Sequence, residues 1–169
     1  VLEENNFDFK AVPTSWRDFK EGNAFRGNGE RFRIEAAPGQ LFSRYLASWQ
    51  TSNFMDTDFS LGLSGFFYNR FLPGWDEERR GGRISLGYQI DKWWSFTTAF
   101  RLEDVIIDNF ATLTPPPVLQ EVNNHNFLST VRTSLAHDTR DSSFIPTNGH
   151  FADIAFEQAV GDFVYPRFE

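Results

Sequence analysis

The segment from residue 59 to residue 71 alternates between apolar and polar residues at every second position. One set of positions holds Phe59, Leu61, Leu63, Gly65, Phe67 and Phe71. The other set holds Ser60, Gly62, Ser64, Tyr68 and Arg70. Successive side chains of a β-strand point to opposite faces, so the pattern predicts a strand between an apolar medium and a wet one. The apolar medium is either a protein core or lipid.

Similar segments recur along the chain, with turn residues between them. They lie at 1–9, 30–37, 44–54, 80–90, 93–107, 126–138 and 151–160, and a further strand begins at 163–168. Only 15–20 indicates a helical turn. The sequence therefore predicts an all-β fold, an antiparallel up-and-down meander of about eight strands.

Composition excludes several classes of protein. Aromatic residues make up 17% of the 169 residues, the net charge is −7, and cysteine is absent. The negative charge and the lack of a basic patch argue against a nucleic-acid partner. The lack of cysteine excludes disulfides and thiol chemistry. No stretch approaches the roughly 20 apolar residues of a membrane-spanning helix.

Three properties favour lipid over a protein core. Strands of about ten residues match the tilted span of a bilayer, whereas strands of soluble proteins are usually shorter. Short connections at 56–58 and 91–92 alternate with longer ones at 72–79 and 111–124, as in outer-membrane barrels. Aromatic residues also gather near strand ends, at Trp49, Trp75, Trp93 and Trp94. We therefore expect a transmembrane β-barrel.

Two neighbouring segments carry a family resemblance. Residues 134–141 read SLAHDTRD, and residues 144–149 read FIPTNG. Together they resemble the strand, turn and strand signature of the outer-membrane barrel assembly factors of the BamA and TamA type, also called bacterial surface antigens. Residues 44–68 resemble an earlier strand pair of that family, and 80–88 resemble the strand that follows. The sequence departs from the family pattern at 52–54, where a proline-containing turn is usual, and at Ile145.

The resemblance implies the fold and the function. It implies part of a 16-stranded transmembrane β-barrel in the outer membrane, beginning within strand 2 and ending within strand 10, with the periplasmic POTRA domains and the later strands absent. The implied function is non-enzymatic assembly, insertion or translocation of outer-membrane proteins, without a cofactor. The implied partners are outer-membrane lipid, unfolded outer-membrane proteins and accessory assembly lipoproteins, and no nucleic acid.

The signature residues allow two interpretations, a catalytic role and a structural role. Its residues are Asp138, Thr139, Arg140, Asp141, Pro146 and Gly149. Two carboxylates around a cation are compatible with general acid and base chemistry. They are also compatible with a turn stiffened by side-chain to backbone hydrogen bonds and an Arg140 ion pair, which we favour. We expect no catalytic, cofactor or metal site.

Charged residues at alternate positions are candidates for the barrel lumen. The main candidates are Arg83, Arg101, Glu103 and Arg132, and the others are Arg31, Arg33, Glu35 and Glu157. A polar interior can hold an inward-folded loop or conduct solutes. Barrel interiors are also polar by default, so no single one of these residues need be required.

Other charged residues suggest weaker hypotheses. Residues 76–78 are all acidic and could bind a divalent cation, although a charge run in a loop is usually only solvated. The histidines His125, His137 and His150 are too far apart in the sequence to predict a ligand set.

Two other functions remain open at this stage. A passive outer-membrane channel would share the alternation and the polar lumen. A secreted carbohydrate-binding β-sandwich would instead use tryptophans as sugar platforms, at Trp16, Trp75 and Trp94.

Overall fold

The computed structural model describes residues 1–22, 24–110, 124–142, 144–161 and 164–169. Within these residues the fold is almost entirely β. The strands are β1 (Leu2–Phe7), β2 (Glu30–Ala37), β3 (Phe42–Thr51), β4 (Phe59–Phe71), β5 (Asp76–Gln89), β6 (Trp94–Asp108), β7 (Asn124–Asp138), β8 (Phe151–Gly161) and β9 (Tyr165–Phe168). A short helix, α1 (Trp16–Glu21), and a single 3-10 turn, η1 (Phe54–Asp56), lie in two of the connections.

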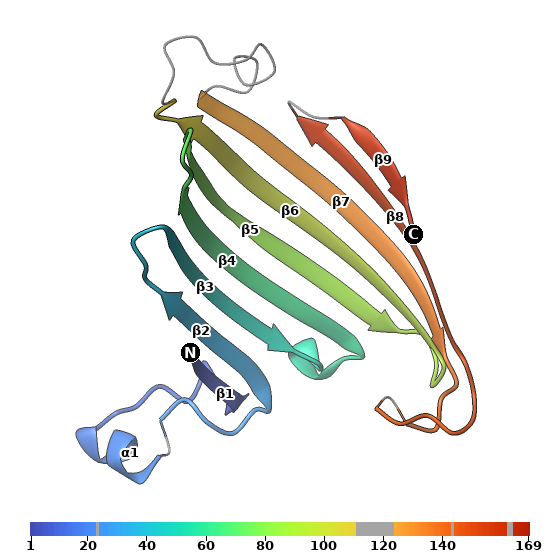
Figure 1. Ribbon diagram of the computed structural model, residues 1–169. Coiled ribbons are helices and arrows are strands. Elements are labelled where there is room, and N and C mark those ends of the chain that lie inside the picture. The colour runs from blue at the N-terminus through green and yellow to red at the C-terminus, as the bar shows by residue number, and fades with distance from the viewer. Residues whose placement is uncertain (23, 111–123, 143, 162–163) are drawn as a thin grey trace.

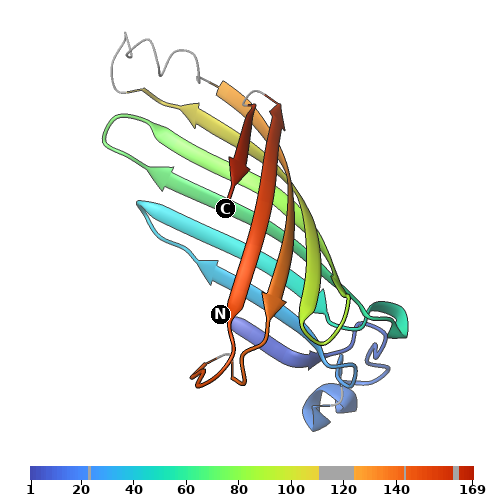
Figure 2. The same ribbon diagram turned by 90° about the vertical axis from the view of Figure 1, so that its right-hand side faces the viewer.

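The nine strands form one sheet in sequence order. Each strand pairs antiparallel with the next, from β1 at one edge to β9 at the other. Figures 1 and 2 show that the sheet is bent into a trough with these two strands along its rims. The predicted all-β meander is therefore confirmed. The strand beyond the expected eight is β9, in the region where the sequence indicated a strand just beginning.

From β2 to β9 the pairing register is continuous, so residues opposite each other on neighbouring strands share a face, whereas the register between β1 and β2 shifts between Glu4 and Phe7. Strands β4 and β5 pair without a break, from Phe59 opposite Tyr88 to Phe71 opposite Asp76. Pairing is equally continuous between β5 and β6 and between β6 and β7. Side chains on the apolar face of one strand therefore lie beside side chains on the apolar face of the next strand. A slip of one residue in the pairing would exchange the two faces.

Two expectations about the connections are wrong. Strand β5 begins at Asp76, so the acidic run lies in a strand and Glu77 and Glu78 point to opposite faces, rather than forming one cluster in a loop. The connection between β4 and β5 is then only 72–75, as short as 90–93. Long connections at 8–29 and 139–150 lie at the same end of the sheet as 90–93, so connection length does not distinguish the two ends. The expected loop at 111–124 falls almost wholly outside the described residues.

The sheet has no core on either side among the described residues. Their only buried hydrophobic residues are Ala99, Ala155 and Ala159. The described strands all belong to one sheet, so a two-sheet sandwich is excluded for them, and the carbohydrate-binding alternative loses its basis. In the same residues no helix is long and apolar enough to cross a membrane.

Candidate functional site

Large apolar side chains cover one face of the sheet, which we call the apolar face. Register places Trp49, Leu63, Ile84, Phe100 and Val131 side by side on successive strands. Ile84 is 54% exposed and Val131 is 44% exposed. A water-soluble protein rarely exposes so wide an apolar surface to solvent. This face therefore requires contact with another apolar surface or with lipid.

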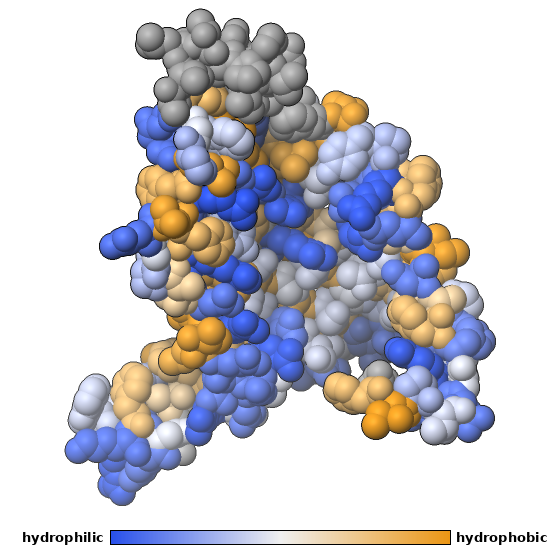
Figure 3. Space-filling model, in the orientation of Figure 1, coloured by the Kyte–Doolittle hydropathy of each residue, from blue (hydrophilic) through white to orange (hydrophobic). Residues whose placement is uncertain are grey.

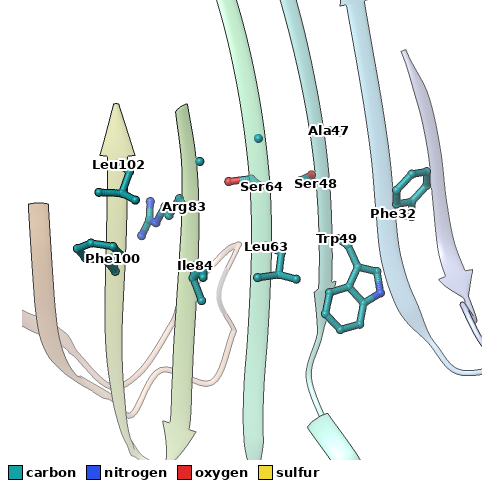
Figure 4. A pocket seen from close by; sticks show the side chains of 12 residues that line it. Phe32, Ala47, Ser48, Trp49, Leu63, Ser64, Arg83, Ile84, Phe100 and Leu102 are labelled. Atoms are coloured by element: carbon teal, nitrogen blue, oxygen red, sulfur yellow. The ribbon is translucent and has the colours of Figure 1, made fainter. Parts of the chain in front are cut away.

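A shallow hollow of about 440 Å³ lies in the middle of the apolar face. Three small residues form its floor. Ala47 lies opposite Gly65, and Gly65 lies opposite Gly82. Figure 4 shows Leu63 and Ile84 among its walls. The hollow is a gap between larger side chains, and its lining is mostly apolar, with Ser48, Ser64 and Arg83 as its polar members.

The apolar face ends in polar residues on the side of the 72–75 connection. The guanidinium of Arg80 donates to the carboxylate of Asp104 at 2.9 Å, and His125 Nδ1 lies 3.1 Å from the same carboxylate. These residues share a face with Leu63, because Arg80 lies opposite Phe67 and Asp104 opposite Arg80. The apolar face is therefore a band with a polar limit, as expected of a surface in a bilayer.

Ion-paired arginines cover the opposite face, which we call the polar face. Glu35 pairs with Arg33 at 2.9 Å and with Arg44 at 3.2 Å. Glu103 pairs with Arg101 on its own strand and with Arg79 on the next strand at 3.7 Å. Figure 3 shows hydrophilic side chains gathered in the hollow of the trough. The polar face is thus the concave one.

All four main lumen candidates lie on the polar face. Arg83 lies directly opposite Arg101 in the register, and Glu103 follows Arg101 at the next inward position. Arg132 lies opposite Glu157, but its guanidinium pairs with Glu169 at 2.6 Å instead. The structure therefore brings Arg83, Arg101 and Glu103 together and leaves Arg132 two strands away from Arg83.

The sequence analysis missed part of this charged surface. Glu77 and Arg79 were assigned to a loop, and Arg44 was not among the lumen candidates. They join Arg101 and Glu103 around a pocket of about 300 Å³. The other lining residues are Phe42, Tyr68 and Arg70. Counting back in steps of two from Arg83 would have found Arg79 and Glu77, because both lie on the same face of an extended strand.

The pocket on the polar face carries an excess of positive charge. It is lined by four arginines and two glutamates. Glu103 is only 2% exposed, and its Oε1 atom accepts no hydrogen bond, while the Nε atom of Arg101 donates none. Arg101 also lies over the ring of Phe66, with its guanidinium carbon 5.2 Å from the ring centroid. The arrangement can bind anionic or hydrogen-bonding groups.

The signature turn joins β7 to β8 through two carboxylates with separate partners. Asp138 accepts from Nε and Nη2 of Arg140 at 2.9 and 2.8 Å. Asp141 accepts from the hydroxyl and the backbone N–H of Thr147 at 2.5 and 3.0 Å. The Thr147 hydroxyl hydrogen bond is the main reason that the pKa of Asp141 falls to about 2. Both carboxylates are thus held by donors within the turn.

The remaining signature residues shape the same turn. The hydroxyl of Thr139 accepts from the backbone N–H of His150 at 2.9 Å. Gly149 has φ +95°, and a Cβ atom there would collide with the backbone of Thr139 and Arg140. Pro146 is exposed. These contacts are those of a stiffened turn. They give no support to the hypothesis of general acid and base chemistry.

Two of the three histidines lie in contact, which their spacing in the sequence did not indicate. His125 lies beside Asp104, but His137 Nδ1 lies 3.1 Å from His150 Nε2. The two rings meet because antiparallel pairing of β7 and β8 returns the chain to the same end of the sheet. Among the described residues no group of three or more His, Asp or Glu is placed to hold a metal ion.

These observations define a class of protein. One up-and-down antiparallel sheet, curved, apolar on its convex face and charged on its concave face, is a segment of β-barrel wall. The Omp85 superfamily domain matches residues 24–169, so the chain belongs to the Omp85 superfamily. This family groups outer-membrane barrel proteins that take part in protein assembly and translocation.

A solved structure shares the fold. The crystal structure of BamA from Haemophilus ducreyi lacking POTRA domains 1–3 is similar to this chain, with a TM-score of 0.57 and 15% sequence identity. The similarity covers 80% of this chain and 29% of that one, so the chain spans less than a third of the similar structure. No protein of curated function is significantly similar to the chain.

Proposed function

We propose that this chain is a wall segment of an outer-membrane β-barrel that inserts or translocates other outer-membrane proteins, without enzymatic chemistry. The observation that carries the proposal is the division of one continuous sheet into an apolar face and an ion-paired polar face, in a chain of the Omp85 superfamily. In this proposal the apolar face contacts lipid and the polar face lines the lumen.

The geometry supports a role for the wall as a fixed scaffold. Strands β3 to β7 pair in continuous register, so opening between them would expose rows of backbone N–H and C=O groups to lipid. Substrate strands would therefore add at an edge elsewhere in the barrel, where pairing is incomplete. The charged lumen wall would present hydrogen-bonding groups to polar chain segments that pass or fold inward.

The proposal is tested with the natural full-length protein in lipid vesicles. An unfolded outer-membrane protein is added, and its folding is followed by the change in gel mobility between heated and unheated samples. We expect faster folding or translocation with the protein than with empty vesicles. A passive channel would instead give steady solute flux in a vesicle-swelling assay and no acceleration of folding, and that result would overturn the proposal.

A further inference from the structure

Two histidine rings lie in contact at the end of the sheet that carries the 90–93 and 139–150 connections. His137 belongs to β7, and His150 directly precedes β8. Their ring centroids are 5.0 Å apart, and Nδ1 of His137 lies 3.1 Å from Nε2 of His150. A short nitrogen to nitrogen contact of this kind needs one proton between the two atoms, or a cation in its place.

The distance suits two ligands of one metal ion. Imidazole nitrogens bind transition metals at about 2.0–2.1 Å, so two nitrogens 3.1 Å apart would subtend roughly 95–100° at the ion. That angle lies between the values of square-planar and tetrahedral coordination. Copper, nickel and zinc all accept imidazole ligands in such geometries.

A neighbouring hydroxyl orients the ring of His150. The Thr139 hydroxyl donates to the carbonyl oxygen of His150 at 3.2 Å, and His150 Nδ1 lies 3.2 Å from the same hydroxyl. The hydroxyl oxygen therefore accepts a hydrogen bond from the Nδ1–H group of His150, which leaves a lone pair on His150 Nε2, facing His137. Such a hydrogen bond to the other ring nitrogen is typical of histidine metal ligands.

The surroundings of His137 also favour a cation. The ring of Trp94 lies across the strand pair with its centroid 4.4 Å from that of His137, which restricts rotation of the histidine. The carboxylate of Asp91, in the adjacent connection, interacts electrostatically with His137. A positive charge at the imidazole pair would be stabilised by this carboxylate.

We propose that His137 and His150 form a two-imidazole site for a divalent transition-metal ion, with water molecules completing its coordination. His137 binds as the tautomer that carries its proton on Nε2, so the ion takes the place of the proton between the rings. Copper should bind most tightly, since it heads the affinity order for nitrogen ligands. Magnesium and calcium should not compete, because they prefer oxygen ligands. The site is independent of the proposed function.

The test uses the natural full-length protein in detergent, titrated with Cu²⁺. Copper at the pair should quench tryptophan fluorescence, and the quenching should be smaller in Trp94→Phe. His137→Gln and His150→Gln should each weaken binding by about tenfold or more, because each removes one of two ligands. His125→Gln is the matched control, since His125 lies beside Asp104 and should leave binding unchanged.

Electron paramagnetic resonance supplies a second measurement that does not depend on folding of a variant. The spectrum of the first bound equivalent of Cu²⁺ should show coupling to two imidazole nitrogens in the wild-type protein. Binding of equal affinity in the His137→Gln and His150→Gln variants would overturn the proposal. A first-equivalent spectrum without nitrogen coupling would also overturn it.

Discussion

The guanidinium of Arg140 donates two hydrogen bonds to the carboxylate of Asp138, at 2.9 and 2.8 Å, across the first residues of the signature turn. The same guanidinium lies over the ring of Phe151, 4.8 Å from the ring centroid. Arg140 therefore ties the end of β7 to the start of β8. We predict that Arg140→Gln lowers the unfolding temperature of the full-length protein in detergent, because it removes the ion pair and the contact with the ring.

Arg140→Lys is the matched control for this prediction. Lysine keeps the charge but lacks the planar fork, so its unfolding temperature should lie between those of the wild type and Arg140→Gln. Equal unfolding temperatures for all three proteins would show that the ion pair contributes nothing to stability. The measurement is circular dichroism during heating.

Acid should loosen the signature turn only at very low pH. The Thr147 hydroxyl hydrogen bond and three backbone N–H groups lower the pKa of Asp141 from 3.8 to about 2. A lowered pKa in the folded state means that the ionised carboxylate stabilises the turn at every pH above 3.8. That contribution is lost as the pH falls through about 2.

Hydrogen exchange at the amides of Thr147 and Asn148 measures this effect. Their protection, corrected for intrinsic exchange, should stay constant down to about pH 4 and fall toward pH 2. Asp141→Asn should show lower protection that does not change over this range. Protection that fell already between pH 6 and pH 5 would contradict the assignment.

Gly149 should tolerate no larger residue. Its φ of +95° is unfavourable for residues with a Cβ, and the added atom would meet backbone atoms that cannot easily move. We predict that Gly149→Ala destabilises the protein by about 1–2 kcal/mol or more in denaturant unfolding. Gly74→Ala is the control, because Gly74 has open space around its Cβ position, and it should change little. Equal effects of the two substitutions would contradict the strained turn.

The fold was predictable where alternation was regular. Phe59 to Phe71 alternates with few exceptions, and it pairs as predicted because a one-residue slip would expose its polar set to the apolar side. The beginning of β5 was not predictable in the same way. Glu77 and Arg79 have the composition of a loop, but both pair with β4 on one side and β6 on the other, and they form an ion pair on one face of the strand.

The sites were predictable only in part, because spacing in a sequence does not give distance across a sheet. Arg83 and Arg101 were expected on one face, and register shows them opposite each other. His137 and His150 looked unrelated, thirteen positions apart, yet the turn between β7 and β8 brings their rings into contact. Such contacts depend on the shape of a turn, for which the sequence gives only weak signals.

The two ends of the sheet should face different compartments. We predict that the signature turn lies in the periplasm, so that the 90–93 connection lies there too and 72–75 lies outside the cell. The chain contains no cysteine, and single cysteines can be introduced at Lys92, which is exposed, and at Gly74, where an added Cβ has open space. In intact cells a membrane-impermeant maleimide should label Gly74→Cys and not Lys92→Cys. Both should be labelled once the outer membrane is permeabilised, and the opposite pattern in intact cells would reverse the orientation.

Adjacent residues of β4 should respond in opposite ways to the same substitution. Leu63 lies on the apolar face beside Ile84, whereas Ser64 lies on the polar face opposite Arg83. Glutamate at position 63 would place a carboxylate against lipid, and we predict that Leu63→Glu lowers the free energy of unfolding by about 2 kcal/mol. Glutamate at position 64 can pair with Arg83, so Ser64→Glu should change it by less than about 0.5 kcal/mol. Denaturant unfolding in lipid vesicles measures both, and equal losses would show that lipid does not cover the apolar face.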